Sequence, residues 1–126
     1  MIKDFLIFNF TGEVNKIGLR VSNNFYIHDY NKKTDNDQLV LSVLNMIKKY
    51  KANVDANFSV LVNSGPGSFS SLRTSIAVAK GIKISNKTKL YGYINSDLGQ
   101  FNLNNIEFLI KKKLIQKNLI KPIYLS

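Results

Sequence analysis

The amino-acid sequence predicts an α/β fold in which helices pack on a five-stranded mixed sheet. Three observations support this prediction. Apolar and polar residues alternate in the segment up to Tyr30, two later segments repeat apolar residues at helical spacing, and a short β-rich run follows each of those segments. A chain of 126 residues can bury one sizeable core. We therefore expect a single domain, residues 1–126.

The amino-terminal part is expected to form an antiparallel meander of three strands. The apolar run from Phe5 to Phe10 predicts a buried strand. The segment from Lys16 to Val21 alternates apolar and polar residues, as a strand with one buried face does. After the turn signal Ser-Asn-Asn at 22–24, the segment from Phe25 to Tyr30 alternates again.

The middle of the chain alternates helices with strands. A helix is expected from about Asp35 to Tyr50, and a second one from Ser68 or Ser70 to Ile84. The strands that follow them are expected at Phe58 to Val62 and at Leu90 to Ile94. Because helical crossovers are right-handed and join parallel strands, these two strands should extend the sheet in parallel.

The carboxy-terminal region, residues 104–126, is expected to pack on this lobe. A last helix is predicted from Asn104 to about Lys117. The tail beyond it should be extended, because Pro122 cannot continue a helix.

Composition limits the compartment and the partners. The chain has no cysteine, which excludes disulfides and thiolate metal sites. It shows neither a signal peptide nor a membrane-spanning run, so we expect a cytoplasmic protein. A formal charge of +10 favours polyanions such as tRNA. The lysines are dispersed in an Asn- and Ile-rich sequence, however, and AT-rich coding explains them equally well.

A glycine-rich turn separates the fourth strand from the second helix in NSGPGSFSSLRTSIAVAKGI, residues 63–82. The turn itself consists of Gly65, Pro66, Gly67 and Ser68. It places backbone N–H groups at the start of a helix, where anions bind. A P-loop continues with Lys and then Ser or Thr after its second glycine, whereas this turn continues with Ser-Phe-Ser-Ser. The turn alone is therefore weak evidence for nucleotide binding.

Both main helices have a side suited to a protein partner. In the second helix, spacings of four, three and four align small side chains into a groove that another helix could approach closely. In the first helix, the apolar face is wider than one sheet contact requires. We expect the interface to comprise Leu39, Val43, Met46, Ser70, Arg73, Thr74, Ala77 and Gly81.

Two alternatives stay open for this surface. The small residues of the second helix could pack inside a tight core, and residue types give this equal weight. Leu72, Ile76 and Ala79, on the opposite side of the helix, suit the chain's own sheet. Arg73, in the first turn, could pair with a partner carboxylate or phosphate, or form a solvent-exposed salt bridge.

The stretch SGPGSFSSLRTSIAVAKGI resembles the Gly-Pro-Gly-Ser-Phe-Thr-Gly-Leu-Arg signature and following helix of the TsaB (YeaZ) family. These proteins are accessory subunits in bacterial threonylcarbamoyladenosine synthesis on tRNA. Seven of the nine signature positions match, and Ser70 and Ser71 stand at the other two. FLIFNFTGEVNKIGL resembles the family's first hairpin and TDNDQLVLSVLNMI its first helix. Pro122, Tyr124 and Leu125 resemble its carboxyl end, with Ser126 where arginine is usual.

The resemblance implies a ribonuclease-H-like lobe of the actin-like ATPase superfamily, in a glycoprotease-like family. It also implies that the second domain of full-length members is missing between Asp97 and Asn104. The family's partner is TsaD, the paralogous catalytic subunit. The interface of the two is a bundle formed by the first helix and the GPGS helix of each. Without that partner, the same helices should form a homodimer.

Catalytic residues are not expected. Asn9 stands where actin-like enzymes place the Asp that organises metal and phosphate, and Asn36 stands where the family usually has His. His28 has no second histidine or cysteine to complete a metal or nucleophile site. The carboxylates are dispersed among turns and caps. No metal or cofactor is expected.

Three functional hypotheses follow. The leading one is a non-catalytic, single-lobe TsaB-like subunit that binds a TsaD-like protein and assists modification of the tRNA adenosine next to the anticodon. The second is a residual nucleotide-binding or hydrolytic activity at the glycine turn. The third is a stand-alone basic tRNA-binding module.

Overall fold

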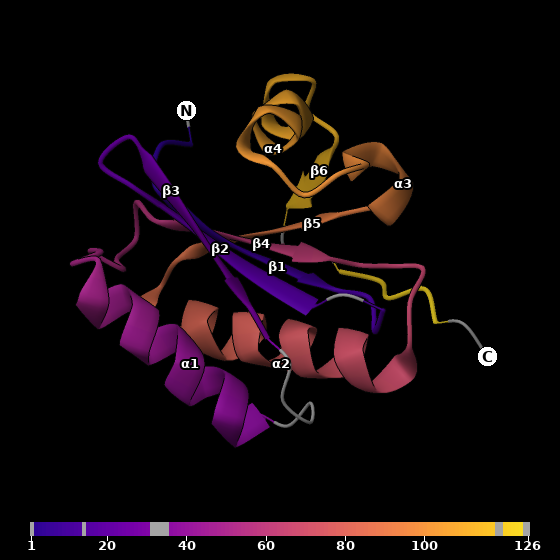
Figure 1. Ribbon diagram of the computed structural model, residues 1–126, viewed down its shortest axis with the longest axis horizontal. Coiled ribbons are helices and arrows are strands. Elements are labelled where there is room, and N and C mark those ends of the chain that lie inside the picture. The colour runs from indigo at the N-terminus through magenta and orange to yellow at the C-terminus, as the bar shows by residue number, and fades with distance from the viewer. Residues whose placement is uncertain (1, 14, 31–35, 118–119, 125–126) are drawn as a thin grey trace.

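A six-stranded mixed sheet forms the centre of the computed structural model, which describes residues 2–13, 15–30, 36–117 and 120–124 (Figure 1). Within this part of the chain the strand order is β3-β2-β1-β4-β5-β6. The predicted α/β class and the meander followed by parallel strands are confirmed, but the sheet has one strand more than expected.

The meander consists of β1 (Phe5–Phe10), β2 (Asn15–Val21) and β3 (Asn24–Asp29). Adjacent strands pair antiparallel, with Phe5 opposite Arg20 and Arg20 opposite Phe25. Ser22 and Asn23 form the second turn with φ of 50° and 70°. Asparagine tolerates this left-handed region better than most residues, which is why the Ser-Asn-Asn signal marked the turn.

The two parallel strands are β4 (Ser59–Asn63) and β5 (Lys89–Tyr93). The helix α1 (Asn36–Lys49) connects the meander to β4, and α2 (Phe69–Asn86) connects β4 to β5. Both helices lie below the sheet in Figure 1. The predicted start of the first helix, at about Asp35, lies outside the described residues.

The carboxy-terminal region corrects the prediction of one helix as far as Lys117. A short helix, α3 (Asn95–Leu98), precedes α4 (Leu103–Lys111), and β6 (Ile115–Lys117) pairs antiparallel with β5. Lys113 has a φ of 58°, and the N–H of Leu114 bonds the carbonyl of Leu109 at 2.9 Å. A left-handed residue at this point ends a helix and turns the chain. The turn lets Ile115 pair with Tyr93, and Ile115 is thereby partly buried against the core below α4.

The sheet separates two hydrophobic cores. Leu6, Phe8 and Phe10 of β1 face α1 and α2, whereas Phe5 and Ile7 face α4. This alternation is what a strand buried on both sides produces. The core beneath α1 and α2 is the larger of the two. Among the described helices, none is both long enough and apolar enough to cross a membrane.

Candidate functional site

The glycine-rich turn lies at the carboxyl ends of the parallel strands, where α/β folds usually bind ligands. Its backbone N–H groups are already bonded to the protein itself. The N–H of Gly67 bonds the carbonyl of Ile123 at 3.1 Å, and that of Ser68 bonds the carbonyl of Thr11 at 2.9 Å. The N–H of Gly65 bonds the Oδ1 of Asn63 at 2.8 Å. These three donors cannot cradle a phosphate unless the surrounding chain moves.

The glycines of the turn serve close packing between chain segments. A Cβ at Gly65 would collide with the carbonyl oxygen of Ile123 in the tail. A Cβ at Gly67 would lie 2.9 Å from both Cα and the carbonyl oxygen of Thr11. Real Cβ atoms do not approach backbone so closely. The turn, the β1–β2 connection and the tail therefore form one packed unit, with Ile123 also donating its N–H to the Ser64 carbonyl at 2.7 Å.

Neutral side chains occupy the carboxyl ends of β1, β4 and β5. The Nδ2 of Asn63 donates to Oδ1 of Asn9 at 2.7 Å and to Oδ1 of Asn95 at 3.0 Å. The hydroxyl of Tyr93 donates to the Phe8 carbonyl at 2.8 Å. Burial raises the pKa of Tyr93 well above its ordinary value and outweighs the opposing effect of Asn63, so the phenol stays neutral. An amide network holds these strand ends together.

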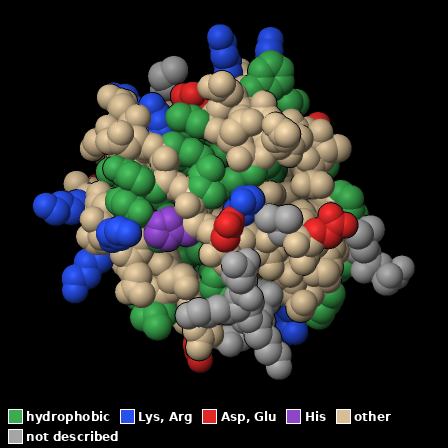
Figure 2. Space-filling model, in the orientation of Figure 1, with side chains coloured by type: hydrophobic (Ala, Val, Ile, Leu, Met, Phe, Trp, Pro, Cys, Tyr) green, Lys and Arg blue, Asp and Glu red, His purple; other side chains and the backbone are tan. Residues whose placement is uncertain are grey.

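Other candidates for catalysis have structural partners. The Nε2 of His28 shares a hydrogen bond of 2.8 Å with the Tyr50 hydroxyl, and the imidazole is visible at the surface in Figure 2. Asp29 pairs with Lys16 at 2.6 Å. Within the described ranges, no three His, Cys, Asp or Glu residues come together in a way that could hold a metal ion.

The predicted residues of α1 do not form a partner surface. Leu39, Val43 and Met46 are 0%, 1% and 2% exposed and belong to the core under the sheet. Their assignment to the interface is therefore corrected, because a partner cannot reach them while the chain is folded. The exposed apolar residues of α1 are Val40, Leu41 and Leu44. Leu41 lies off the apolar stripe of the helix in the sequence. This position was the signal that an apolar residue of α1 faces away from the sheet.

The predicted residues of α2 are mostly open. Ser70, Arg73, Ala77 and Gly81 are exposed, whereas Thr74 is buried at 7% exposure. A Cβ at Gly81 would meet nothing within 4 Å, so no part of the described chain covers this position. The alternative that the small stripe packs internally holds for Thr74 only. Leu72, Ile76 and Ala79 are buried, which confirms that the opposite side of α2 packs inward.

Exposed residues of the two helices make up what we call the helix surface: Val40, Leu41, Leu44, Ser70, Arg73, Ala77, Gly81 and Ile84. Val40 and Leu44 line a shallow apolar groove with Ile82 of α2, so the two helices form a continuous face there. Ile84 is 81% exposed. The guanidinium of Arg73 lies 5.7 Å from the ring centre of Phe69, a cation–π arrangement at the start of α2.

The strand order and the two crossover helices define a mixed α/β lobe, with the glycine turn at the carboxyl ends of its parallel strands. No protein-family model matches the sequence, and no curated protein does. Among solved structures, the chain is similar to YeaZ from Pseudomonas aeruginosa, with a TM-score of 0.64 and 18% sequence identity over 77% of this chain and 45% of that one. It is also similar to a protein described as having similarity to peptidase YeaZ from Pseudomonas aeruginosa, with a TM-score of 0.62 and 19% identity over 77% and 44% of the two chains.

The chain therefore has a YeaZ-like fold, as the resemblance implied. It spans just under half the length of the two structures that it matches.

Proposed function

We propose that this protein is a non-catalytic, TsaB-like accessory subunit that binds a TsaD-like catalytic protein in the cytoplasm. In this proposal it assists threonylcarbamoyl modification of the tRNA adenosine next to the anticodon. The proposal rests on one observation above all. Gly81 and Ala77 are exposed on a long helix, and nothing in the described chain lies over Gly81.

The composition of the helix surface supports a helical partner. Leu41 and Leu44 are 56% and 55% exposed, which costs free energy in water unless another protein covers them. Small residues on the neighbouring helix permit close approach of a helix backbone. The helix surface thus places the exposed leucines of α1 beside the small residues of α2. A second pair of helices could pack against both. Without the partner, the same face should pair two copies of this chain.

The amide network and the occupied turn support a non-catalytic role. A nucleotide site would need free N–H donors or a carboxylate for magnesium, and Gly67 and Asn9 provide neither. This weighs against the nucleotide-binding alternative. Lys and Arg side chains lie at several separate places on the face shown in Figure 2, which does not favour a stand-alone tRNA-binding surface. Contact with tRNA through the complex remains part of the proposal.

Co-purification with the TsaD-like protein of the same cell tests the proposal. The native chain should retain the partner, whereas Ala77→Arg and Gly81→Arg should each weaken retention by at least about tenfold, because a long charged side chain would fill the groove. Both positions are exposed, so the variants should keep their fold, which circular dichroism can verify.

Asn104→Arg provides the matched control. It adds the same charge at an exposed position of a helix on the opposite side of the sheet. It should bind the partner as the native chain does. If the native chain fails to retain the partner, or if the groove variants retain it equally well, the proposal is wrong.

A further inference from the structure

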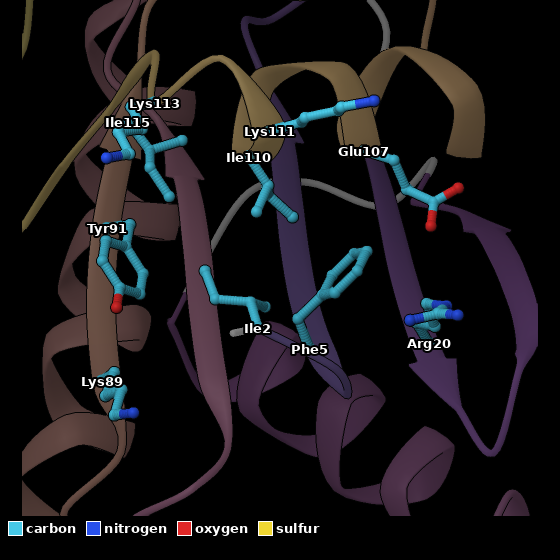
Figure 3. A pocket seen from close by; sticks show the side chains of 10 residues that line it. All are labelled: Ile2, Phe5, Arg20, Lys89, Tyr91, Glu107, Ile110, Lys111, Lys113 and Ile115. Carbon is cyan, nitrogen blue, oxygen red and sulfur yellow. The ribbon is translucent and has the colours of Figure 1, made fainter.

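A cavity of about 770 Å³ lies on the sheet face opposite α1 and α2 (Figure 3). It opens between α4 and the strands and is framed by the start of β1, by β2, β5 and β6. Its volume is in the range of pockets that hold small organic ligands. The proposed partner binds elsewhere, so this cavity is not explained by the proposed function.

The floor of the cavity is apolar. Phe5 is 1% exposed, and Ile2 and Ile110 pack against the same core from either side of it. The cavity exists because α4 has only nine residues and covers part of the sheet face. In Figure 3, Ile2, Phe5 and Ile110 lie in the middle of the cavity. An apolar floor of this kind favours a hydrocarbon or aromatic body.

Charged groups surround this floor unevenly. Lys89, Tyr91 and Lys113 lie along one side in Figure 3, with Lys89 and Lys113 at its two ends. Arg20, Lys111 and Glu107 lie toward the other side. Lys89 and Tyr91 are two residues apart on β5 and therefore point to the same face of the sheet.

Two features of the rim favour an anion on the β5 side. No salt bridge in the described part of the chain involves Lys89 or Lys113. Among the residues that the structure describes, the only carboxylate that lines the cavity belongs to Glu107, on the far side. On that far side the Nε of Arg20 is buried and makes no hydrogen bond to a described residue. The cavity as a whole is thus rich in positive charge.

We propose that the cavity binds a linear amphiphile with an anionic head and an apolar tail. The head, a carboxylate or a phosphate, lies beside the ammonium group of Lys89 and the hydroxyl of Tyr91. The tail lies over Phe5, Ile2 and Ile110, where it removes apolar surface from water. The ammonium group of Lys89 and the phenolic hydroxyl of Tyr91 match the donors that such a head requires.

Titration of the whole chain with ten-carbon probes, followed by amide chemical shifts, tests this proposal. Decanoate and decyl phosphate represent the two sources of the head group, and binding of either one supports the site. The largest shifts should fall on residues around Phe5, Tyr91 and Ile110. Decyltrimethylammonium has a tail of the same length and the opposite charge, and it should leave these shifts unchanged.

Charge variants locate the head group. Lys89→Glu should weaken binding of the anionic probe by about tenfold or more. Lys112→Glu is the matched control, because it makes the same charge change at an exposed lysine that lies over Phe108 instead of lining the cavity. It should change the affinity by less than about twofold.

Three outcomes would overturn the proposal: neither anion binds, the cationic probe binds as well as the anions, or the strongest shifts fall on the helix surface. Equal weakening by Lys112→Glu would also contradict it, since the effect would then come from net charge alone. All of these outcomes are independent of whether the TsaD-like partner binds.

Discussion

On one face of the sheet, α1 and α2 supply 14 and 18 residues of helix, whereas on the other α4 supplies nine (Figure 1). The long pair covers the larger core and still has an outer side with exposed apolar residues, such as Leu44 and Ile84. The short helix leaves a cavity between itself and the sheet. The uncovered apolar surface is therefore the outer side of α1 and α2 on one face and the wall of a cavity on the other. The first suits a protein partner, and the second suits a small molecule.

The largest expected effect compares one leucine from each face. Leu72 of α2 and Leu109 of α4 are both 0% exposed. Leu72→Ala should reduce the free energy of unfolding by about 3–5 kcal/mol, because the closed core cannot collapse around the gap. Leu109→Ala should cost about 2–3 kcal/mol, since the side chains beside an open cavity can relax. Urea unfolding of both variants measures the difference, and equal costs would show that the two cores are packed alike.

A pair of glycines sharpens the comparison at a smaller scale. A Cβ at Gly18 would lie 2.7 Å from Cζ of Phe25 and 2.8 Å from Cγ2 of Ile7, in the core below α4. Gly18→Ala should therefore destabilise the protein by about 1–3 kcal/mol through overcrowding.

Gly81→Ala should have the opposite sign. Because the position is open, alanine should stabilise α2 by about 0.5–1 kcal/mol through its better helix propensity. Thermal unfolding of both glycine variants provides the measurement. If Gly81→Ala destabilises the isolated chain, then Gly81 serves the chain's own packing instead of a partner.

The smallest expected effect concerns Tyr93, which is buried in the core below α4. Burial raises the pKa of its phenol well above the ordinary value, so the folded protein keeps a proton that the unfolded chain releases above about pH 10. The stabilisation is fully present below that pH and is lost as the pH rises beyond it. Between pH 9 and pH 11 the native chain should lose about 1 kcal/mol more stability than Tyr93→Phe. Urea unfolding of the native chain and of Tyr93→Phe at both pH values measures this difference. If the two proteins lose stability equally, the phenol ionises in the folded protein as easily as in the unfolded chain.

Local spacing was sufficient to predict most elements of this fold. The alternation in 16–21 and 25–30 and the helical repeat around Val43 predicted their strands and helix to within a residue or so. The same method failed after Lys111, because Lys-Lys-Lys contains no glycine to indicate the left-handed turn at Lys113. It also failed to predict which side of the first helix packs on the sheet. A helical repeat shows that one side is apolar, but it does not show whether the sheet or a partner covers that side.

The sequence by itself determined the order of strands and helices as far as β5, the absence of a phosphate-binding lysine, and the neutral side chain at Asn9. Only the tertiary structure decided that Ile123 and Thr11 occupy the donors of the glycine turn, that Leu39 faces inward while Leu41 faces solvent, and that α4 leaves a cavity. The physical reason is that propensity and periodicity act between neighbours in the chain. Hydrogen bonds and burial depend on residues such as Gly67 and Ile123, which meet only when the chain folds.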